Sequence, residues 1–154
     1  AYCLMPNHFH LLIRQNLDIP TSKLFGKLCT SYSMYFNKKY NRVGHVFQDQ
    51  FKQKNIQDDR YFLWTSAYIH LNPVWAHIVK NVDQYPWSSV HDYINVDGGG
   101  TGIVEPEIVL EQTAGHSYKD FLIEAQEIGE DKLNSDFDFE LVEEVREGIV
   151  KDAP

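Results

Sequence analysis

Two histidines separated by one residue, His8 and His10, are the sharpest chemical feature of the sequence. On a β-strand, residues i and i+2 point to the same face, so both imidazoles would project side by side. Neighbouring imidazoles are suited to binding one divalent cation. Two histidines near the end of a strand are more often without any such role, so the spacing alone leaves both interpretations open.

Tyr68 and Asn72 form a second pair that could carry chemistry. On a helix, residues i and i+4 lie on one face, one turn apart. A phenol is a poor nucleophile at neutral pH because its unperturbed pKa is about 10. A cation beside a reacting phosphate would stabilise the phenolate, and the Asn72 side-chain oxygen could bind that same ion. The alternative is a core aromatic residue followed by a turn residue before Pro73. His70 points away from Tyr68 and is expected either to pack or to support a residue of the site from behind.

Basic residues cluster around the turn that follows the first expected helix. Aromatic residues alternate with them, as on surfaces that stack bases and contact phosphates of single-stranded nucleic acid. A solvated charged face would give the same pattern, and neither interpretation is favoured by the spacing. The basic residues of this cluster are Lys38, Lys39, Arg42, Lys52 and Lys54.

The acidic character of the chain belongs to its C-terminal third. The net charge is −8, but residues 1–100 contain ten Lys/Arg and seven Asp/Glu (net +3), and residues 101–154 contain four and fifteen (net −11). A mildly basic domain with an acidic appendage can still bind a phosphate backbone through a local patch. The charge therefore permits a nucleic-acid partner without predicting one.

Composition indicates a globular protein of a reducing compartment. A chain of 154 residues, 43% of them hydrophobic, can bury one core. No apolar run reaches the roughly 18 residues that a membrane span needs, which predicts no membrane partner. Two cysteines, Cys3 and Cys29, are too few for a disulfide framework and indicate the cytoplasm.

Hydrophobic periodicity predicts the elements that would position these residues. Residues 1–14 are expected to form a strand that is interrupted by a Pro-Asn pair, and residues 46–56 a second strand. Residues 19–40 are expected to form a helix with Thr21 or Ser22 as its N-cap. The apolar stripe of this helix consists of Leu24, Leu28, Tyr32 and Tyr35.

The second half of the chain is expected to be mostly helical. Asp58 or Asp59 should cap a helix that runs from Arg60 towards Leu71. Pro73 should end or bend this helix, because proline disfavours helical geometry at the residue before it. The segments expected beyond it are a Gly-rich linker at 97–103, short helices at 105–112 and 118–126, and an acidic stretch to residue 154.

Three motifs occur together and in one order: LMPNHFHLLI at 4–13, RVGHVFQDQFK at 42–52, and YIHLNPVWAHIV at 68–79 followed by YPWSS. In this combination the sequence strongly resembles transposases of the insertion-sequence-200-like superfamily, in particular the REP-associated tyrosine transposases. The resemblance runs from residue 1 to about residue 95. It continues weakly through 104–122, which is similar to the C-terminal helical extension of that family.

The resemblance implies an α+β fold, a ferredoxin-like HUH domain with a central antiparallel sheet and a C-terminal helical extension. The family usually has a strand, a helix and a further strand before the HUH strand. These are absent, so the domain is expected to be N-terminally truncated. The implied organisation is the HUH tyrosine transposase domain at 1–96, the linker at 97–103, the helical extension at 104–128 and an acidic tail at 129–154.

The resemblance also implies roles for individual residues. His8 and His10 match the HUH pair, Tyr68 matches the catalytic tyrosine, and Asn72 matches the polar residue that joins the histidines around Mg²⁺ or Mn²⁺. The implied reaction cleaves and rejoins single-stranded DNA through a 5′-phosphotyrosine and releases a 3′-OH. DNA hairpins are the expected substrates, with the basic cluster as a DNA-binding surface, and a monomer and a homodimer both fit the family.

Two positions depart from the family's pattern. Gln50 stands where a basic residue is usual, and Trp75 stands where arginine is common. Both changes remove positive charge near the expected DNA path, and they favour a second hypothesis: a catalytically impaired hairpin-binding remnant of a transposase. A third hypothesis is a hydrolase whose HxH pair activates water. A covalent tyrosine adduct would separate the first hypothesis from the second, and a Tyr68→Phe substitution would separate the first from the third.

Overall fold

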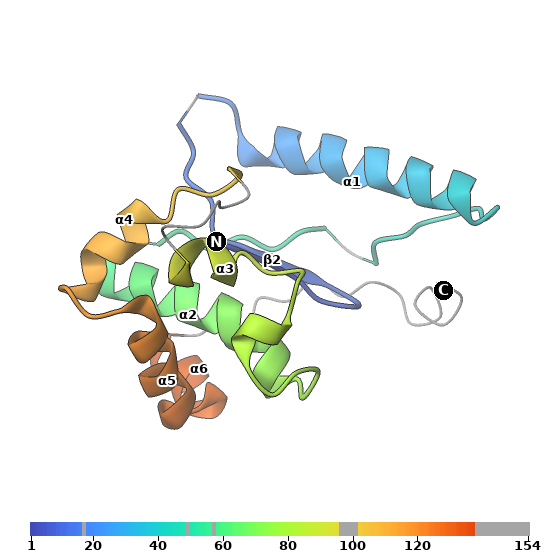
Figure 1. The fold of residues 1–154 in the computed structure, drawn as a ribbon. Coiled ribbons are helices and arrows are strands. Elements are labelled where there is room, and N and C mark those ends of the chain that lie inside the picture. Colours follow the sequence, from blue (N-terminus) through green and yellow to red (C-terminus); the bar gives the residue numbers. More distant parts are fainter. Residues whose placement is uncertain (17, 49, 57, 96–101, 138–154) are drawn as a thin grey trace. The chain divides into compact units, whose positions relative to one another are not determined.

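The computed structural model describes residues 1–16, 18–48, 50–56, 58–95 and 102–137, and these fall into two units (Figure 1). The larger unit contains residues 1–5, 9–12 and, from residue 54 onward, the rest of the described chain. The smaller unit contains residues 6–8 and 13–53. Most of the expected linker (97–101) and most of the acidic tail (138–154) lie outside the described residues.

A short hairpin opens the chain where a single strand, interrupted by the Pro-Asn pair, was expected. Strands β1 (Tyr2–Leu4) and β2 (Phe9–Leu11) pair antiparallel, with Cys3 opposite His10. The expectation of a single strand over residues 1–14 is therefore wrong. The Pro-Asn pair lies between the two strands, and proline favours a reversal here because it lacks an N–H for a ladder.

The segment before α3 adds further backbone bonds to β1. The Leu4 amide donates to the Trp87 carbonyl at 2.8 Å, and the Ser89 amide donates to the Tyr2 carbonyl at 3.0 Å. Within the described residues the sheet has two strands, so the α+β class is confirmed, whereas a ferredoxin-like sheet is not seen there.

Helix α2 (Asp59–Trp75) lies among the other helices of the larger unit, in green in Figure 1. Its first turn is fixed by Asp58, whose carboxylate accepts a hydrogen bond from the Tyr61 amide at 2.7 Å. This confirms the expected N-cap. Every residue from Ser66 to Pro73 is buried, as in helices that are surrounded by protein.

Helix α2 continues past Pro73, so of the two expectations, that the helix ends or that it bends there, the first is wrong. Proline lacks the N–H that would bond to the carbonyl four residues earlier. The hydrogen bonding resumes directly afterwards, because the Ala76 amide donates to the Asn72 carbonyl at 2.9 Å. Burial of this part of α2 is the reason, since tertiary packing outweighs the local preference of the residue before proline.

Short helices follow α2 and cover it. The core of the larger unit contains Leu71 of α2, Tyr93 of α3, and Phe121 and Leu122 of α5. In the described part of the chain, no helix is long and apolar enough to cross a membrane. The bounds are Val82–Gln84 for η1, Val90–Ile94 for α3, Glu107–Leu110 for α4, Glu111–Thr113 for η2, Tyr118–Ile128 for α5 and Glu130–Phe137 for α6.

Removing the N-cap of α2 should weaken the larger unit. An Asp58→Ala variant leaves the Tyr61 amide without its 2.7 Å partner. We expect the free energy of unfolding to fall by about 1 kcal/mol, as for other N-cap losses. Chemical denaturation followed by circular dichroism measures it. Asp58→Asn should recover most of the loss because the amide oxygen also caps, and equal stability of the alanine and wild-type chains would contradict the assignment.

The smaller unit is dominated by α1 (Thr21–Lys39), which confirms the expected helix. Pro20 occupies the N-cap position and no side chain caps the helix, so the expectation for Thr21 and Ser22 is wrong. Proline fixes a backbone angle that suits a helix start, and the Pro20 carbonyl accepts a hydrogen bond from the Lys23 amide at 2.9 Å.

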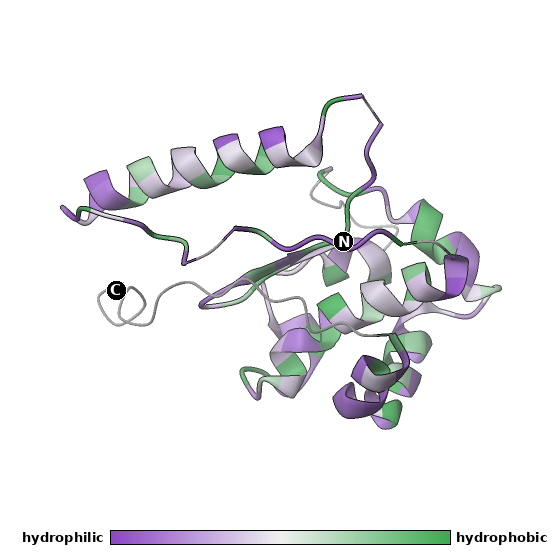
Figure 2. Ribbon diagram, turned by 180° about the vertical axis from the view of Figure 1, so that it is seen from behind, coloured by the Kyte–Doolittle hydropathy of each residue, from purple (hydrophilic) through white to green (hydrophobic). Residues whose placement is uncertain are grey.

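The apolar stripe of α1 does not face a core. Its four members are 46–58% exposed, and Figure 2 shows hydrophobic residues spread along the helix. The buried side chains are Phe25, whose ring lies 4.9 Å from that of Phe51, and Phe36, which packs with Val46. Among the described residues between 46 and 56 there is no strand, since the described part of the smaller unit offers no strand to pair with.

Candidate active site around Tyr68

Tyr68 is buried on α2, with 5% of its surface exposed. The ring of His10 meets it edge-on, with centroids 5.7 Å apart and planes at 85°. The indole of Trp75 lies at the same centroid distance. Leu133 of α6 packs in the same cluster. The structure therefore places one of the predicted histidines against the predicted nucleophile.

Local structure explains why these rings meet. β1 packs on α2, and β2 is held beside β1 by the pairing of Cys3 with His10. Trp75 follows Tyr68 by seven residues, which is about two helical turns, so both project from one face of α2. A hairpin and a helix that are far apart in sequence thus bring an imidazole to a phenol.

Asn72 lies one turn beyond Tyr68 and is 8% exposed. Its side-chain nitrogen donates to the Tyr68 carbonyl at 3.4 Å. Since the nitrogen is engaged, the amide oxygen is the atom that could face a cation, and amide oxygens are common ligands of hard divalent ions. This orientation fits the role that the sequence suggested for Asn72.

His8 precedes β2 and belongs to the smaller unit. It is half-buried, and its Nδ1 lies 2.7 Å from the Asn7 side-chain oxygen. The larger unit thus contains His10, Tyr68 and Asn72, whereas His8 belongs to the smaller unit. Over the residues that the structure describes, no group of three or more His, Cys, Asp or Glu side chains is placed so that it could hold a metal ion.

His70 is fully buried on the opposite side of α2 and connects four elements. Its Nδ1 lies 2.8 Å from the Tyr118 hydroxyl of α5, and its Nε2 lies 2.9 Å from the Ser89 hydroxyl before α3. Tyr118 donates onward to Ser66 at 2.9 Å. The Tyr2 amide of β1 donates to Ser89 at 2.8 Å. His70 therefore packs, as its helical position predicted.

The donors in this network fix the tautomer of His70. Ser66 donates to the Leu63 carbonyl at 2.6 Å, and Tyr118 donates its single proton to Ser66. Tyr118 can then only accept from the imidazole, so Nδ1 carries the proton. Nε2 faces the Ser89 hydroxyl, which also lies 3.2 Å from the Tyr2 carbonyl that accepts from it. Burial lowers the pKa of His70 well below its ordinary value of 6.5 and raises that of Tyr118 well above 10. The network thus holds a neutral imidazole.

Three of the predicted DNA-binding residues lie at the end of α1. Lys38 and Lys39 are exposed in its last turn, and the Lys39 ammonium lies 5.2 Å from the centre of the Tyr40 ring. A hydrogen bond with Tyr40 raises the pKa of Lys39. The Arg42 guanidinium lies 6.0 Å from the Phe36 ring centre. Cations over aromatic faces are therefore present where the sequence predicted them.

The other two predicted basic residues belong to different units. Lys52 is exposed in the smaller unit, whereas Lys54 belongs to the larger unit. The Lys54 ammonium donates to the Phe137 carbonyl at 3.1 Å and lies 5.2 Å from the Tyr61 ring centre. Lys54 thus ties the start of α2 to the end of α6, a contact that the sequence pattern did not suggest.

The sequence reasoning missed two neighbours of Tyr68. Trp75 was noted only for lacking the charge of an arginine, although its spacing of seven residues indicates a shared helix face. Leu133 lies in α6, within the stretch expected to be an acidic tail. Its contact with Tyr68 depends on how α5 and α6 fold back on α2, and no local pattern signals that.

Residues 1–72 match the family model described as "Transposase IS200 like". A Haemophilus influenzae protein named "Putative REP-associated tyrosine transposase" is 32% identical over 102 residues. That match covers 59% of this chain, and the chain spans 57% of the length of that relative. No solved structure matches the chain significantly. The resemblance to this transposase group is therefore confirmed for the part of the chain that carries His8, His10, Tyr68 and Asn72.

Proposed function

We propose, from this similarity of residues 1–72 to IS200-like transposases, that the chain cleaves and rejoins single-stranded DNA through a phosphotyrosine at Tyr68. One observation carries the proposal: the His10 ring lies against Tyr68, with centroids 5.7 Å apart, and Asn72 lies one helical turn away. This combination of nucleophile, imidazole and amide supports a single-tyrosine mechanism. The expected substrate class is DNA hairpins.

The role of Tyr68 follows from its surroundings. Its hydroxyl oxygen attacks the scissile phosphorus, and a tyrosine–phosphate bond forms as the bond to the 3′ oxygen breaks. The phenol loses one proton and the departing oxygen gains one. Attack by a DNA 3′-OH on the phosphotyrosine then restores a phosphodiester and frees Tyr68. The packed rings of His10 and Trp75 restrict the orientation of the phenol, which favours in-line attack.

His8, His10 and Asn72 are the residues that would hold Mg²⁺ or Mn²⁺ in this proposal. Imidazole nitrogens and an amide oxygen form a donor set that divalent metals accept, and the orientation of Asn72 leaves its oxygen for this purpose. When bound, the ion would stabilise negative charge on the scissile phosphate and on the attacking oxygen. His8 would complete the set from the segment directly before β2.

The basic residues are proposed to contact the DNA backbone. Lysine and arginine neutralise phosphates, and the aromatic rings beside them can stack on bases. Binding to this surface should weaken steeply with salt. The residues concerned are Lys38, Lys39, Arg42, Lys52 and Lys54.

A covalent-trapping assay tests the proposed function. The chain is incubated with labelled hairpin oligonucleotides and Mn²⁺ and then separated on a denaturing gel. We expect a labelled band at the mass of the protein plus one DNA fragment. Hairpins that are cut without any labelled protein would instead support the hydrolase hypothesis.

Removing divalent ions should abolish this adduct. We expect chelation with EDTA to lower adduct formation by about 100-fold or more, because a cation at a phosphate contributes several kcal/mol to catalysis, and added Mn²⁺ should restore it. His10→Ala should reproduce the defect without rescue by Mn²⁺. His116→Ala, at an exposed position, is the matched control. Undiminished adduct formation in EDTA would contradict a metal role.

A hairpin-binding remnant is the second candidate, and the burial of Tyr68 favours it. With 5% exposure and Leu133 packed in its cluster, the phenol has little open surface for a phosphate. This candidate predicts hairpin binding without an adduct. The denaturing gel distinguishes this candidate from the proposed cleavage activity, provided that hairpin binding is measured in parallel on a native gel.

A further inference from the structure

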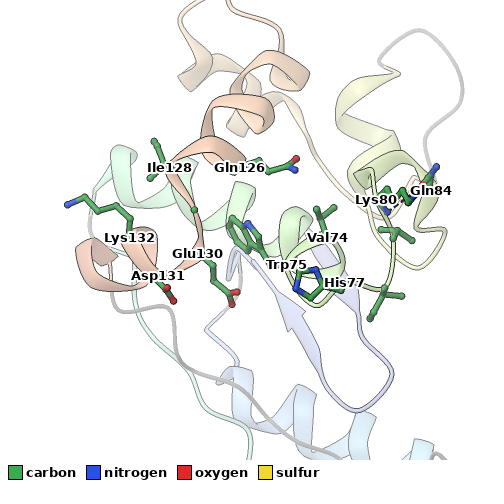
Figure 3. A pocket seen from close by; sticks show the side chains of 13 residues that line it. Val74, Trp75, His77, Lys80, Gln84, Gln126, Ile128, Glu130, Asp131 and Lys132 are labelled. Carbon is green, nitrogen blue, oxygen red and sulfur yellow. Dashed lines mark hydrogen bonds between the residues drawn. The ribbon is translucent and has the colours of Figure 1, made fainter.

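A groove of about 1240 Å³ lies beside the C-terminal end of α2 in the larger unit (Figure 3). One wall comes from the end of α2 and the turn after it, including Trp75 and His77. The other wall comes from the junction of α5 and α6, including Gln126 and Glu130. Its volume exceeds the range of about 300–1,000 Å³ that is usual for small-molecule pockets. It therefore suits a short piece of polymer better than a small molecule.

Trp75 connects this groove to the candidate active site. Its half-buried indole lines the groove, and the same ring lies 5.7 Å from the Tyr68 ring. A strand whose phosphate reaches Tyr68 would therefore have a neighbouring nucleotide at Trp75. A tryptophan face is a strong stacking platform for a base and does not require a particular sequence.

The charges on the α5–α6 wall of the groove favour a base over a phosphate, whereas Lys80 lies beside Gln84 on the other wall. Lys132 forms an ion pair with Asp136 at 3.3 Å, which leaves its charge partly compensated. The carboxylates of Glu130 and Asp131 lie in the same wall and would repel a phosphate. A carboxylate instead accepts hydrogen bonds from the amino groups of bases, as it does from cytosine N4.

The rim of the groove is the C-terminal cap of α2. His77 directly follows the C-cap residue Ala76 and adopts a left-handed conformation with φ of 55°, as residues at this position commonly do. The His77 amide donates to the Val74 carbonyl and the Ile78 amide donates to the Pro73 carbonyl, both at 2.9 Å. The groove wall is therefore set by α2 itself.

We propose that this groove is a nucleobase subsite, in which Trp75 stacks on a base and Glu130 accepts a hydrogen bond from that base's exocyclic amino group. The inference rests on the proposed function for its ligand class, single-stranded DNA. It predicts a preference for bases that carry an amino group, such as cytosine, over uracil or thymine. The subsite would hold the nucleotide next to the phosphate that Tyr68 attacks.

Binding of two matched probes tests the subsite. The 12-mers dC12 and dU12 differ at the base mainly in an amino group against a carbonyl group. Their affinities are measured by fluorescence anisotropy at fixed salt on the full chain carrying Tyr68→Phe, which prevents cleavage. We expect dC12 to bind roughly fivefold more tightly than dU12. Trp75→Ala should weaken both probes by roughly 5- to 150-fold, and Glu130→Ala should remove the preference for dC12.

Two further variants control for nonspecific effects of removing an indole and for poor folding. Trp87→Ala removes an indole that is 62% exposed and does not line the groove, so it should leave both affinities unchanged. Trp75→Phe keeps an aromatic face and should retain most of the affinity, even if the alanine variant folds poorly. Equal binding by the Trp75→Ala and Trp87→Ala variants, or no preference for dC12, would overturn the subsite.

The outcomes also separate the subsite from the proposed function. If the unmodified chain forms a Tyr68 adduct but the groove variants bind DNA normally, the subsite is wrong and the proposed function stands. If no adduct forms but Trp75→Ala and Glu130→Ala change binding as expected, the groove binds bases and the cleavage proposal is wrong.

Discussion

A Tyr68→Phe variant should form no covalent adduct with single-stranded DNA. The substitution removes one oxygen atom, the one proposed to attack phosphorus, and keeps the ring that packs against His10 and Trp75. Without this nucleophile no phosphotyrosine can form, so the adduct should fall below detection. The denaturing gel used for the parent chain provides the measurement.

A matched control distinguishes the loss of the nucleophile from a folding defect in this variant. Tyr61→Phe removes a hydroxyl elsewhere on α2 and should leave adduct formation near the parent level. Both variants should bind hairpins as the parent does. An adduct of normal yield on the Tyr68→Phe chain would show that another residue is the nucleophile.

A His70→Ala variant should lose a large part of the stability of the larger unit. The imidazole is fully buried between Tyr118 and Ser89, at 2.8 and 2.9 Å. Truncation leaves a cavity and two hydroxyls short of a partner. We expect the free energy of unfolding to fall by about 3 kcal/mol or more, since each buried unsatisfied group costs about 1–3 kcal/mol. Urea denaturation followed by tryptophan fluorescence measures it.

Tyr118→Phe isolates the hydrogen bonds from the cavity. The ring remains, while the links to His70 and Ser66 are lost, so the expected loss is smaller, about 1–3 kcal/mol. His116→Ala, at an exposed histidine, should change stability by less than about 0.5 kcal/mol. A His70→Ala chain as stable as the His116→Ala chain would contradict the network.

The same network predicts how stability depends on pH. The pKa of His70 is lowered in the folded chain, so below its ordinary value of 6.5 the unfolded chain binds a proton that the folded chain does not. Stability should therefore fall as the pH drops below about 6.5, by up to about 1.4 kcal/mol per pH unit from this group. The pKa of Tyr118 is raised above 10, so stability should also fall above about pH 10. Burial raises the pKa of Cys3 and of Tyr93 as well, so Tyr118→Phe should remove only part of the loss of stability at alkaline pH. A Tyr118→Phe chain with the same loss as the parent would contradict this.

Local signals predicted the helices well. The Asp58 cap, the long periodic stretch of α1 and the start of α5 after Ser117 each depend on neighbouring residues in the chain. The errors arose where contacts between residues far apart in the sequence determine the secondary structure. α2 runs through Pro73 because it is buried, and residues 46–56 lack a partner strand among the described residues of their unit.

For the candidate site, too, features that depend on neighbouring residues could be predicted, whereas contacts between distant residues could not. The i, i+4 spacing of Tyr68 and Asn72 was readable from sequence, and so was the chemistry of a phenol beside an amide. The contact of His10 with Tyr68 was expected only from the resemblance, because 58 residues separate the two. The surroundings of His70 could not be predicted, since its partners Ser89 and Tyr118 are 19 and 48 residues away and lie before α3 and in α5.

The polarity of the DNA–protein linkage is the most direct test of the central proposal. A hairpin oligonucleotide carries one fluorophore on each side of the cleaved phosphate and is incubated with the chain and Mn²⁺. The account predicts that Tyr68, located by mass spectrometry of the digested protein, carries only the fragment on the 3′ side of the cut, through its 5′ phosphate. The other fragment should end in a 3′-OH that a polymerase can extend. Two free fragments, or a linkage to the fragment on the 5′ side, would contradict it.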